Sequence, residues 1–133
     1  MRRDTLHLTL AFLGDIPAER LVEATRVADG VVAEPFSLTL DRLGYWKHNR
    51  IVWAGGESPP LTFLAGALTD GLRAAGFALE ARPFVAHLTL LRDAHCVDVP
   101  SLPAPVAWPV REFVLAQSGN GRYEVIGRWP LGA

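Results

Sequence analysis

The feature that most constrains this chain is a tetrapeptide that occurs twice, as His7-Leu8-Thr9-Leu10 and as His87-Leu88-Thr89-Leu90. The chain of 133 residues holds only four histidines, and two of them open these repeats. In an extended strand the histidine and the threonine project from one face, while both leucines project into the core. Two such strands facing each other would form a polar patch of two imidazoles and two hydroxyls.

This set of side chains suits acid–base chemistry. An imidazole has an ordinary pKa of about 6.5, so one histidine can serve as general base while the other serves as general acid near neutral pH. A threonine hydroxyl can bond a phosphoryl oxygen without adding charge. The alternative interpretation is that both histidines are half-buried strand residues repeated by gene duplication, with no surviving chemistry.

Apolar periodicity predicts two helices. The first begins at Pro17, with Asp15 as its cap, and ends at Gly30. The second opens at Ser58-Pro59-Pro60 and stops at Gly76. Its apolar stripe consists of Leu61, Leu64, Leu68 and Leu72. We expect this second helix to cover a sheet.

Alternating patterns predict the strands, over residues 6–13, 36–41, 51–54, 85–91, 110–117 and 122–129. We expect 36–41 and 51–54 to pair as a hairpin, and Gly119-Asn120-Gly121 to turn a second hairpin. The proline-rich stretch 99–109 is expected to be a loop. Each half of the chain then contains a strand that carries the His-Leu-Thr-Leu motif, near a helix and a hairpin. The predicted fold is therefore α+β, a duplicated α/β unit in a single domain over residues 1–133.

Composition agrees with one domain, since 50% of the residues are hydrophobic. Thirteen Lys and Arg against fourteen Asp and Glu give a net charge of -1, so any recognition of phosphate must be local. No stretch approaches the length of a membrane span, and the N-terminal residues lack the apolar region of a signal peptide. We therefore expect a soluble, cytoplasmic protein. A single cysteine, Cys96, excludes an internal disulfide framework.

The two tetrapeptides lie within longer segments, HLTLAFLG at 7–14 and RPFVAHLTLLR at 82–92. These segments resemble the two signatures of the two-histidine (2H) phosphoesterases, specifically the bacterial and archaeal RNA 2',3'-cyclic phosphodiesterases once called 2'-5' RNA ligases. Supporting similarity at 43–46, 50–53 and 121–129 extends the resemblance over nearly the whole chain. The resemblance implies a bilobal fold with pseudo-twofold symmetry, in which antiparallel sheets line a central groove that holds the active site.

The resemblance also implies a reaction and a set of roles. Water attacks the phosphorus of a 2',3'-cyclic phosphate on a nucleoside or RNA end, the ribose 3'-oxygen leaves, and a 2'-phosphate results; reverse 2'-5' ligation is expected to be weak. His7 would be the acid and His87 the base. Thr9 and Thr89 would hold non-bridging oxygens, and Arg92 would neutralise charge on them in the transition state. The scheme requires no metal and no cofactor.

Four further residues are candidates for binding the substrate. Phe12, Trp46 and Tyr123 carry rings on which a base can stack, although packing in the core or at its rim would explain each of them as well. Arg50 is a candidate for guiding an RNA strand, with a solvated surface arginine as the alternative.

The chain departs from the family pattern at two places. Family members usually carry proline before the second histidine, where this chain has Ala86. They also normally begin with another strand and helix, whereas only Met1 to Leu6 precede the first motif here. A missing strand would expose a sheet edge beside a catalytic strand, which would allow the chain to self-associate through that edge.

Other classes of function remain open from the residues alone. The chain could be a nucleotide- or RNA-binding module that turns nothing over, although binding alone would not need both imidazoles. A metal site could use His7, His87, His95 and Cys96, but their spacing lacks the usual ligand frames. Cyclic ADP-ribose phosphates or other small cyclic esters are alternative substrates, because no residue visibly reads a base.

Overall fold

The structure, a computed structural model, describes residues 7–79, 84, 86–92, 95, 104–119 and 122–132. Its elements are a 3-10 turn Ala18–Arg20, α1 Leu21–Asp29, β1 Phe36–Leu40, β2 Arg42–Trp46, β3 Ile51–Gly55, α2 Pro59–Ala74, β4 His87–Leu91, β5 Val106–Val110, β6 Glu112–Gly119 and β7 Arg122–Pro130. The strands pair in antiparallel fashion as β1–β5, β2–β3–β4 and β6–β7. Helices beside antiparallel sheets confirm the predicted α+β class.

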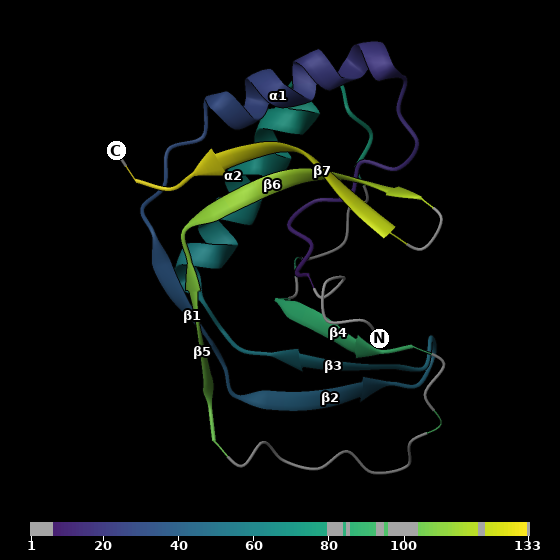
Figure 1. Ribbon diagram of the computed structural model, residues 1–133, viewed down its shortest axis with the longest axis vertical. Helices are drawn as coiled ribbons and strands as arrows, with labels where there is room; N and C mark the ends of the chain where they lie inside the picture. The colour runs from purple at the N-terminus through teal and green to yellow at the C-terminus, as the bar shows by residue number, and fades with distance from the viewer. Residues whose placement is uncertain are drawn as a thin grey trace.

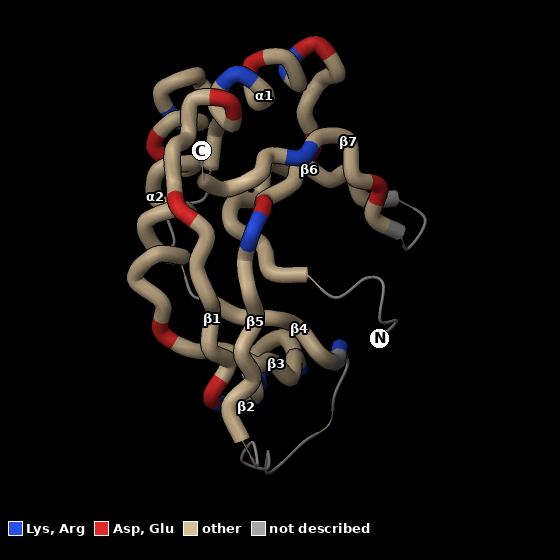
Figure 2. Tube along the Cα trace, turned by 60° about the vertical axis from the view of Figure 1, so that its left-hand side comes forward, with Lys and Arg blue, Asp and Glu red and all other residues tan. Residues whose placement is uncertain are grey.

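Figure 1 shows the elements arranged in two lobes. The β6–β7 hairpin lies with α1 and α2 in one lobe, the β2–β3–β4 sheet forms the other, and β1 and β5 run together along one side. The segment that starts at residue 7 lies beside β4 between the lobes, both in Figure 1 and in the turned view of Figure 2. No helix in the described part of the chain is long and apolar enough to span a membrane.

Helix α2 is built as the sequence predicts. The Ser58 hydroxyl caps it by accepting a hydrogen bond of 3.3 Å from the Leu61 backbone N–H, and prolines occupy its first positions. The four stripe leucines, Leu61, Leu64, Leu68 and Leu72, are all buried. One hydrophobic cluster contains Leu61, a second contains Leu64 and Leu68, and a third contains Leu72. Helix α2 therefore connects the cores of the two lobes.

The predicted hairpin of β6 and β7 is confirmed, with Asn120 and Gly121 of its turn outside the described residues. Trp129 on β7 stacks on Phe113 of β6 at a centroid distance of 5.5 Å. The Trp129 indole N–H also donates a hydrogen bond of 2.7 Å to the Asp29 carboxylate at the end of α1. These contacts fix the hairpin against the helices.

The predicted hairpin between 36–41 and 51–54 is wrong. β1 pairs with β5 instead, where it buries Leu38 and Leu40, and β3 pairs with β2. Residues 42–46, for which the apolar pattern predicts no strand, form β2, joined to β3 by a turn of only four residues, 47–50. A short turn between adjacent strands closes at a lower entropic cost than the longer connection from β1.

Three further expectations need correction. The described residues of the expected strand 6–13 lie outside any strand, because alternation sets the two faces of a segment but supplies no hydrogen-bonding neighbour. Asp15 does not cap the first helix, since a 3-10 turn capped by Pro17, with no side-chain hydrogen bond, precedes α1. Part of the expected loop 99–109 is strand β5, in which proline at 109 is tolerated at a sheet edge.

Candidate active site

The leucines of the two tetrapeptides meet in one hydrophobic cluster. Leu88 is buried in that cluster, and Leu8, Leu10 and Leu90 pack against it as partly buried neighbours. The predicted inward direction of these leucines is therefore confirmed. Since the leucines of both motifs pack in the same cluster, the segments that carry the two histidines are neighbours in the structure.

The second motif lies on β4, whose register fixes its neighbours. His87 is opposite Gly55 and Thr89 is opposite Trp53 on β3, while Leu88 is opposite the buried Ala54. His87 and Thr89 therefore share the sheet face that carries Trp53. Thr89 is a buried polar residue with 8% of its surface exposed, and His87 is half-buried. A histidine and a threonine on one face are what the alternation predicts.

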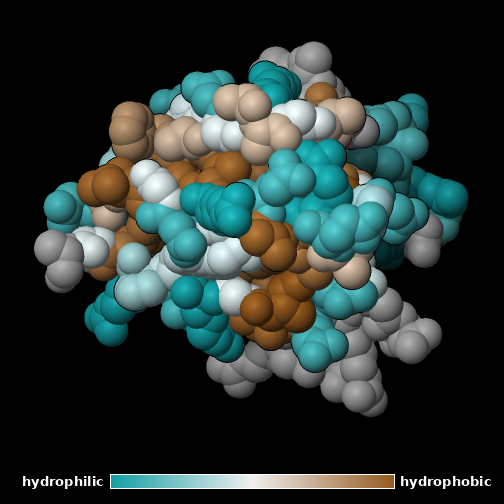
Figure 3. Space-filling view, turned by 90° about the horizontal axis from the view of Figure 1, so that it is seen from above, coloured by the Kyte–Doolittle hydropathy of each residue, from teal (hydrophilic) through white to brown (hydrophobic). Residues whose placement is uncertain are grey.

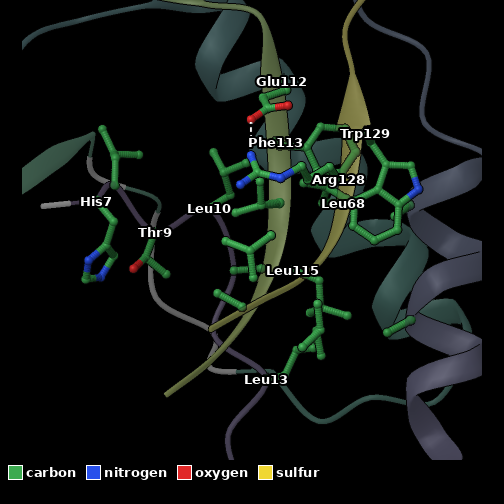
Figure 4. Close-up of a pocket in the computed structure, with 18 of the residues that line it drawn as sticks. His7, Thr9, Leu10, Leu13, Leu68, Glu112, Phe113, Leu115, Arg128 and Trp129 are labelled. Carbon is green, nitrogen blue, oxygen red and sulfur yellow. Dashed lines mark hydrogen bonds and ion pairs between the residues drawn. The ribbon is translucent and has the colours of Figure 1, made fainter. Parts of the chain in front are cut away.

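The first motif reaches a similar arrangement without a strand. Figure 4 shows His7 and Thr9 projecting to the same side of their segment, away from the leucine-rich part of the pocket. His7 is half-buried and Thr9 is exposed. The His7 ring lies 4.3 Å from the Tyr123 ring of β7, measured between centroids. The polar half of this motif therefore faces the β6–β7 hairpin.

A cavity of about 1360 Å³ adjoins the first motif. His7 and Thr9 line one end of it, and the rest is mainly apolar (Figure 4). The apolar lining includes Leu10, Leu13, Leu68, Phe113, Leu115 and Trp129. The cavity thus has a mainly hydrophobic lining, with polar side chains at His7 and Thr9 and, on another side, the Glu112–Arg128 ion pair (Figure 4).

The rings around His87 form a compact aromatic group. Trp46 of β2 lies 4.7 Å from the His87 ring and 5.4 Å from the Trp53 ring, between centroids. The sequence analysis missed Trp53 and the exposed His48, which lies 6.3 Å from Trp46. Trp53 alternates with the buried Val52 and Ala54, so its projection from the opposite face was readable from the sequence.

The remaining predicted site residues lie on exposed surface. Arg92 follows β4 directly and is exposed. Arg50 is exposed at the end of the turn between β2 and β3, where its φ of 55° places it in the left-handed region. Phe12 is 74% exposed and lines the cavity next to the first motif. Arg92 and Phe12 each lie within a few residues of a motif, whereas Arg50 is at a hairpin end.

Charge on this molecule is scattered. Figure 2 shows basic and acidic residues interspersed along the trace, and the ion pairs Arg128–Glu112 and Arg42–Asp41 are exposed. Exposed pairs of this kind contribute little to stability. No three His, Cys, Asp or Glu side chains gather as a metal site in the described part of the chain. Of the metal ligands considered from the sequence, His95 is exposed and Cys96 lies outside the described residues.

Comparisons with known proteins agree with this arrangement. A model of the LigT-like phosphoesterases matches residues 1–53. The RNA 2',3'-cyclic phosphodiesterase of Escherichia coli is 40% identical over 135 residues, which cover 96% of this chain and 77% of that protein. A protein of the same name from Geobacillus stearothermophilus is 33% identical over 98% of this chain and 47% of its own length.

Solved structures extend the similarity to the fold. The crystal structure of E. coli LigT complexed with 3'-AMP has a TM-score of 0.88 and 37% identity, and the match covers 98% of this chain and 79% of that chain. Paired His/Thr motifs on an α+β frame define a phosphoesterase of the two-histidine class. The chain belongs to the LigT-like phosphoesterase family.

Proposed function

We propose that this chain hydrolyses 2',3'-cyclic phosphate ends of RNA or nucleotides to 2'-phosphates. The observation that carries the proposal is the pair of tetrapeptides whose leucines share one hydrophobic cluster, which supports neighbouring positions for the two segments that carry the histidines. The relatives named RNA 2',3'-cyclic phosphodiesterase support the choice of substrate. E. coli LigT has been solved with 3'-AMP, ATP and NADP+, which supports a site for nucleotides here.

Each of the two histidines carries out one of the two proton transfers in the proposed reaction. The oxygen of a water molecule attacks phosphorus and passes its proton to His87, the base. The bond between phosphorus and the ribose 3'-oxygen breaks, and His7, the acid, donates a proton to that oxygen. The 2'-phosphate leaves, and solvent exchange restores both protonation states. Each proton transfer in the transition state is worth about a hundredfold to ten-thousandfold in rate.

The neighbouring polar groups stabilise the phosphoryl oxygens. The Thr89 hydroxyl is buried and the Thr9 hydroxyl is exposed, so they would donate hydrogen bonds from two different surroundings. The Arg92 guanidinium would balance the charge that develops on these oxygens. Phe12, which is largely exposed beside the first motif, is suited to contact a base, and Arg50 to contact an RNA strand farther away.

The experiment is turnover of 2',3'-cyclic AMP and of an RNA oligonucleotide with a 2',3'-cyclic end, in the presence of EDTA. We expect a 2'-phosphate as the product, at an undiminished rate in chelator, and loss of turnover in His87→Ala. A 3'-phosphate product or a strict requirement for a divalent ion would contradict the mechanism. Binding without turnover by the folded chain would favour a nucleotide-binding module.

We also propose that the chain is cytoplasmic and self-associates through a sheet edge. In the part of the chain that the structure describes, β4 is the last strand of the β2–β3–β4 sheet, and the outer strand of a sheet is where a strand of another chain can add. A second copy added to this edge would lie next to His87 and Thr89. Light scattering should show a mass that rises above 14.5 kDa with concentration. A constant monomer mass over the whole concentration range would reject this assembly.

A further inference from the structure

Each of the two motif histidines has an aromatic ring packed against it from the hairpin of its own lobe. His7 contacts Tyr123 of the β6–β7 hairpin at 4.3 Å and an interplanar angle of 53°. His87 contacts Trp46 of the β2–β3 hairpin at 4.7 Å and 63°. A ring contact thus accompanies the histidine of each motif, although the ring is a tyrosine for His7 and a tryptophan for His87.

Trp46 is itself held by the sheet below it. Its ring packs on Trp53 at 5.4 Å, and Trp53 lies across two glycines. A Cβ at Gly44 would approach the Trp53 ring to 2.2 Å, and one at Gly55 would approach it to 2.9 Å. Because only glycine leaves room for the indole at these positions, Trp53 lies close against the sheet and supports Trp46 from one side. The His87 contact is therefore backed by two packed layers, Trp46 on Trp53 and Trp53 on the sheet.

This arrangement bears on whether the rings act as stacking platforms for a base. A platform needs an open ring face. Trp46 is half-buried among His87, Trp53 and His48, so much of its surface is already in contact. Tyr123 is 44% exposed, but its ring also packs against His7. Both rings are thus engaged with an imidazole before any substrate arrives.

We propose that Trp46 and Tyr123 are positioning residues, which set the orientation of the His87 and His7 imidazoles. The proposal rests on the proposed function, because orientation matters only if both imidazoles transfer protons. A proton transfer requires the ring nitrogen to lie within hydrogen-bond reach of the reacting oxygen. A ring packed at 4 to 5 Å restricts rotation of the imidazole and keeps that nitrogen in place.

The experiment compares three substrates that share the ribose 2',3'-cyclic phosphate and differ only at C1': 2',3'-cyclic AMP, 2',3'-cyclic CMP and the base-free methyl β-D-ribofuranoside 2',3'-cyclic phosphate. We expect Trp46→Ala and Tyr123→Ala each to lower kcat by about tenfold or more, by the same factor for all three substrates, with little change in KM. Trp46→Phe and Tyr123→Phe, which keep a ring, should recover most of the rate. Phe63→Ala is the matched control, since it removes a 65% exposed aromatic ring on α2, outside the candidate site, and should leave the rate unchanged.

A loss confined to the two nucleotides, or a rise in KM with kcat intact, would overturn the proposal in favour of base stacking. NMR of the four histidine rings provides a readout independent of turnover. The ring current of Trp46 should displace the His87 resonances, and Trp46→Ala should shift them while leaving the fold intact by circular dichroism. Resonances that do not move would also overturn the proposal. If the wild-type chain hydrolyses none of the three substrates, the proposed function fails, whereas the NMR result still decides the ring contact.

Discussion

At the residue scale, the two identical tetrapeptides differ in their surroundings. Thr89 is buried on a strand, whereas Thr9 is exposed on a segment outside any strand. His87 packs against a supported tryptophan and His7 against a partly exposed tyrosine. An acid and a base have opposite protonation requirements, so unequal surroundings suit a pair that must divide these roles.

Substitution of Arg92 tests whether its charge stabilises the transition state. Arg92→Ala should lower kcat/KM by about thirtyfold to a thousandfold, which corresponds to roughly 2 to 4 kcal/mol of transition-state stabilisation. The measurement is steady-state kinetics with 2',3'-cyclic AMP. Arg26→Ala on the exposed face of α1 removes an equal charge away from both motifs and should leave the rate unchanged. Equal rates for the two variants would place Arg92 outside the site.

At the element scale, small residues in the β2–β3–β4 sheet shape the aromatic group beside His87. Gly44 lies opposite Trp53 in the β2–β3 register, and Gly55 lies opposite His87 in the β3–β4 register. The indole of Trp53 occupies the space over these two glycines. In the proposed role of Trp46, these two glycines contribute by leaving room for the indole on which Trp46 packs.

Gly44→Ala should therefore destabilise the sheet and impair the site together. The new methyl group meets the Trp53 ring, and we expect a loss of about 1 to 3 kcal/mol of unfolding free energy along with reduced turnover. Gly66→Ala is the matched control, because its Cβ on the exposed face of α2 meets nothing within 4 Å. That control should gain about 0.5 to 1 kcal/mol. Urea unfolding measures both, and a neutral Gly44→Ala would contradict this view of the sheet.

The elements were predictable where one local signal determined them. Ser58, the prolines after it and the leucine stripe located α2, and the glycines near 119 located the β6–β7 hairpin. The pairing of strands was harder to predict from the sequence. Strand β1 pairs with β5, about seventy residues away, and local alternation carries no information on such a distant partner. Strand β2 was missed because glycine and charged residues weaken its apolar pattern.

At the scale of the whole molecule, the site depends on how the two lobes are joined. α2 contributes leucines to the clusters of both, and the motif leucines fix the two histidine segments in a shared cluster. The space-filling view in Figure 3 shows hydrophobic surface interspersed with polar residues on the face seen from above. Exposed apolar side chains of the described residues include Val22 and Val32. The sequence alone predicted the motifs and their leucine direction, but not the aromatic contacts, which depend on how the lobes fold.

Substitution of Leu88 tests whether the hydrophobic cluster holds both histidine segments in place. Leu88→Ala removes a buried side chain from the cluster that holds both motifs and should cost about 2 to 5 kcal/mol of unfolding free energy. Because both segments lose support, turnover should fall even where the variant remains folded. Thermal unfolding and kinetics on the same sample measure the two effects. Full activity in a destabilised Leu88→Ala would show that the cluster does not hold the histidines in place.

The most direct test of the account is the dependence of kcat/KM on pH for the wild type, His7→Ala and His87→Ala. We expect a bell-shaped profile for the wild type, since the base must be neutral and the acid protonated. Each variant should lose at least about a hundredfold in rate. His87→Ala should also lose the acidic limb, where the base becomes protonated, and His7→Ala the alkaline limb, where the acid loses its proton. A complete bell, or a nearly normal rate, in either variant would contradict the claim that these two histidines share the reaction.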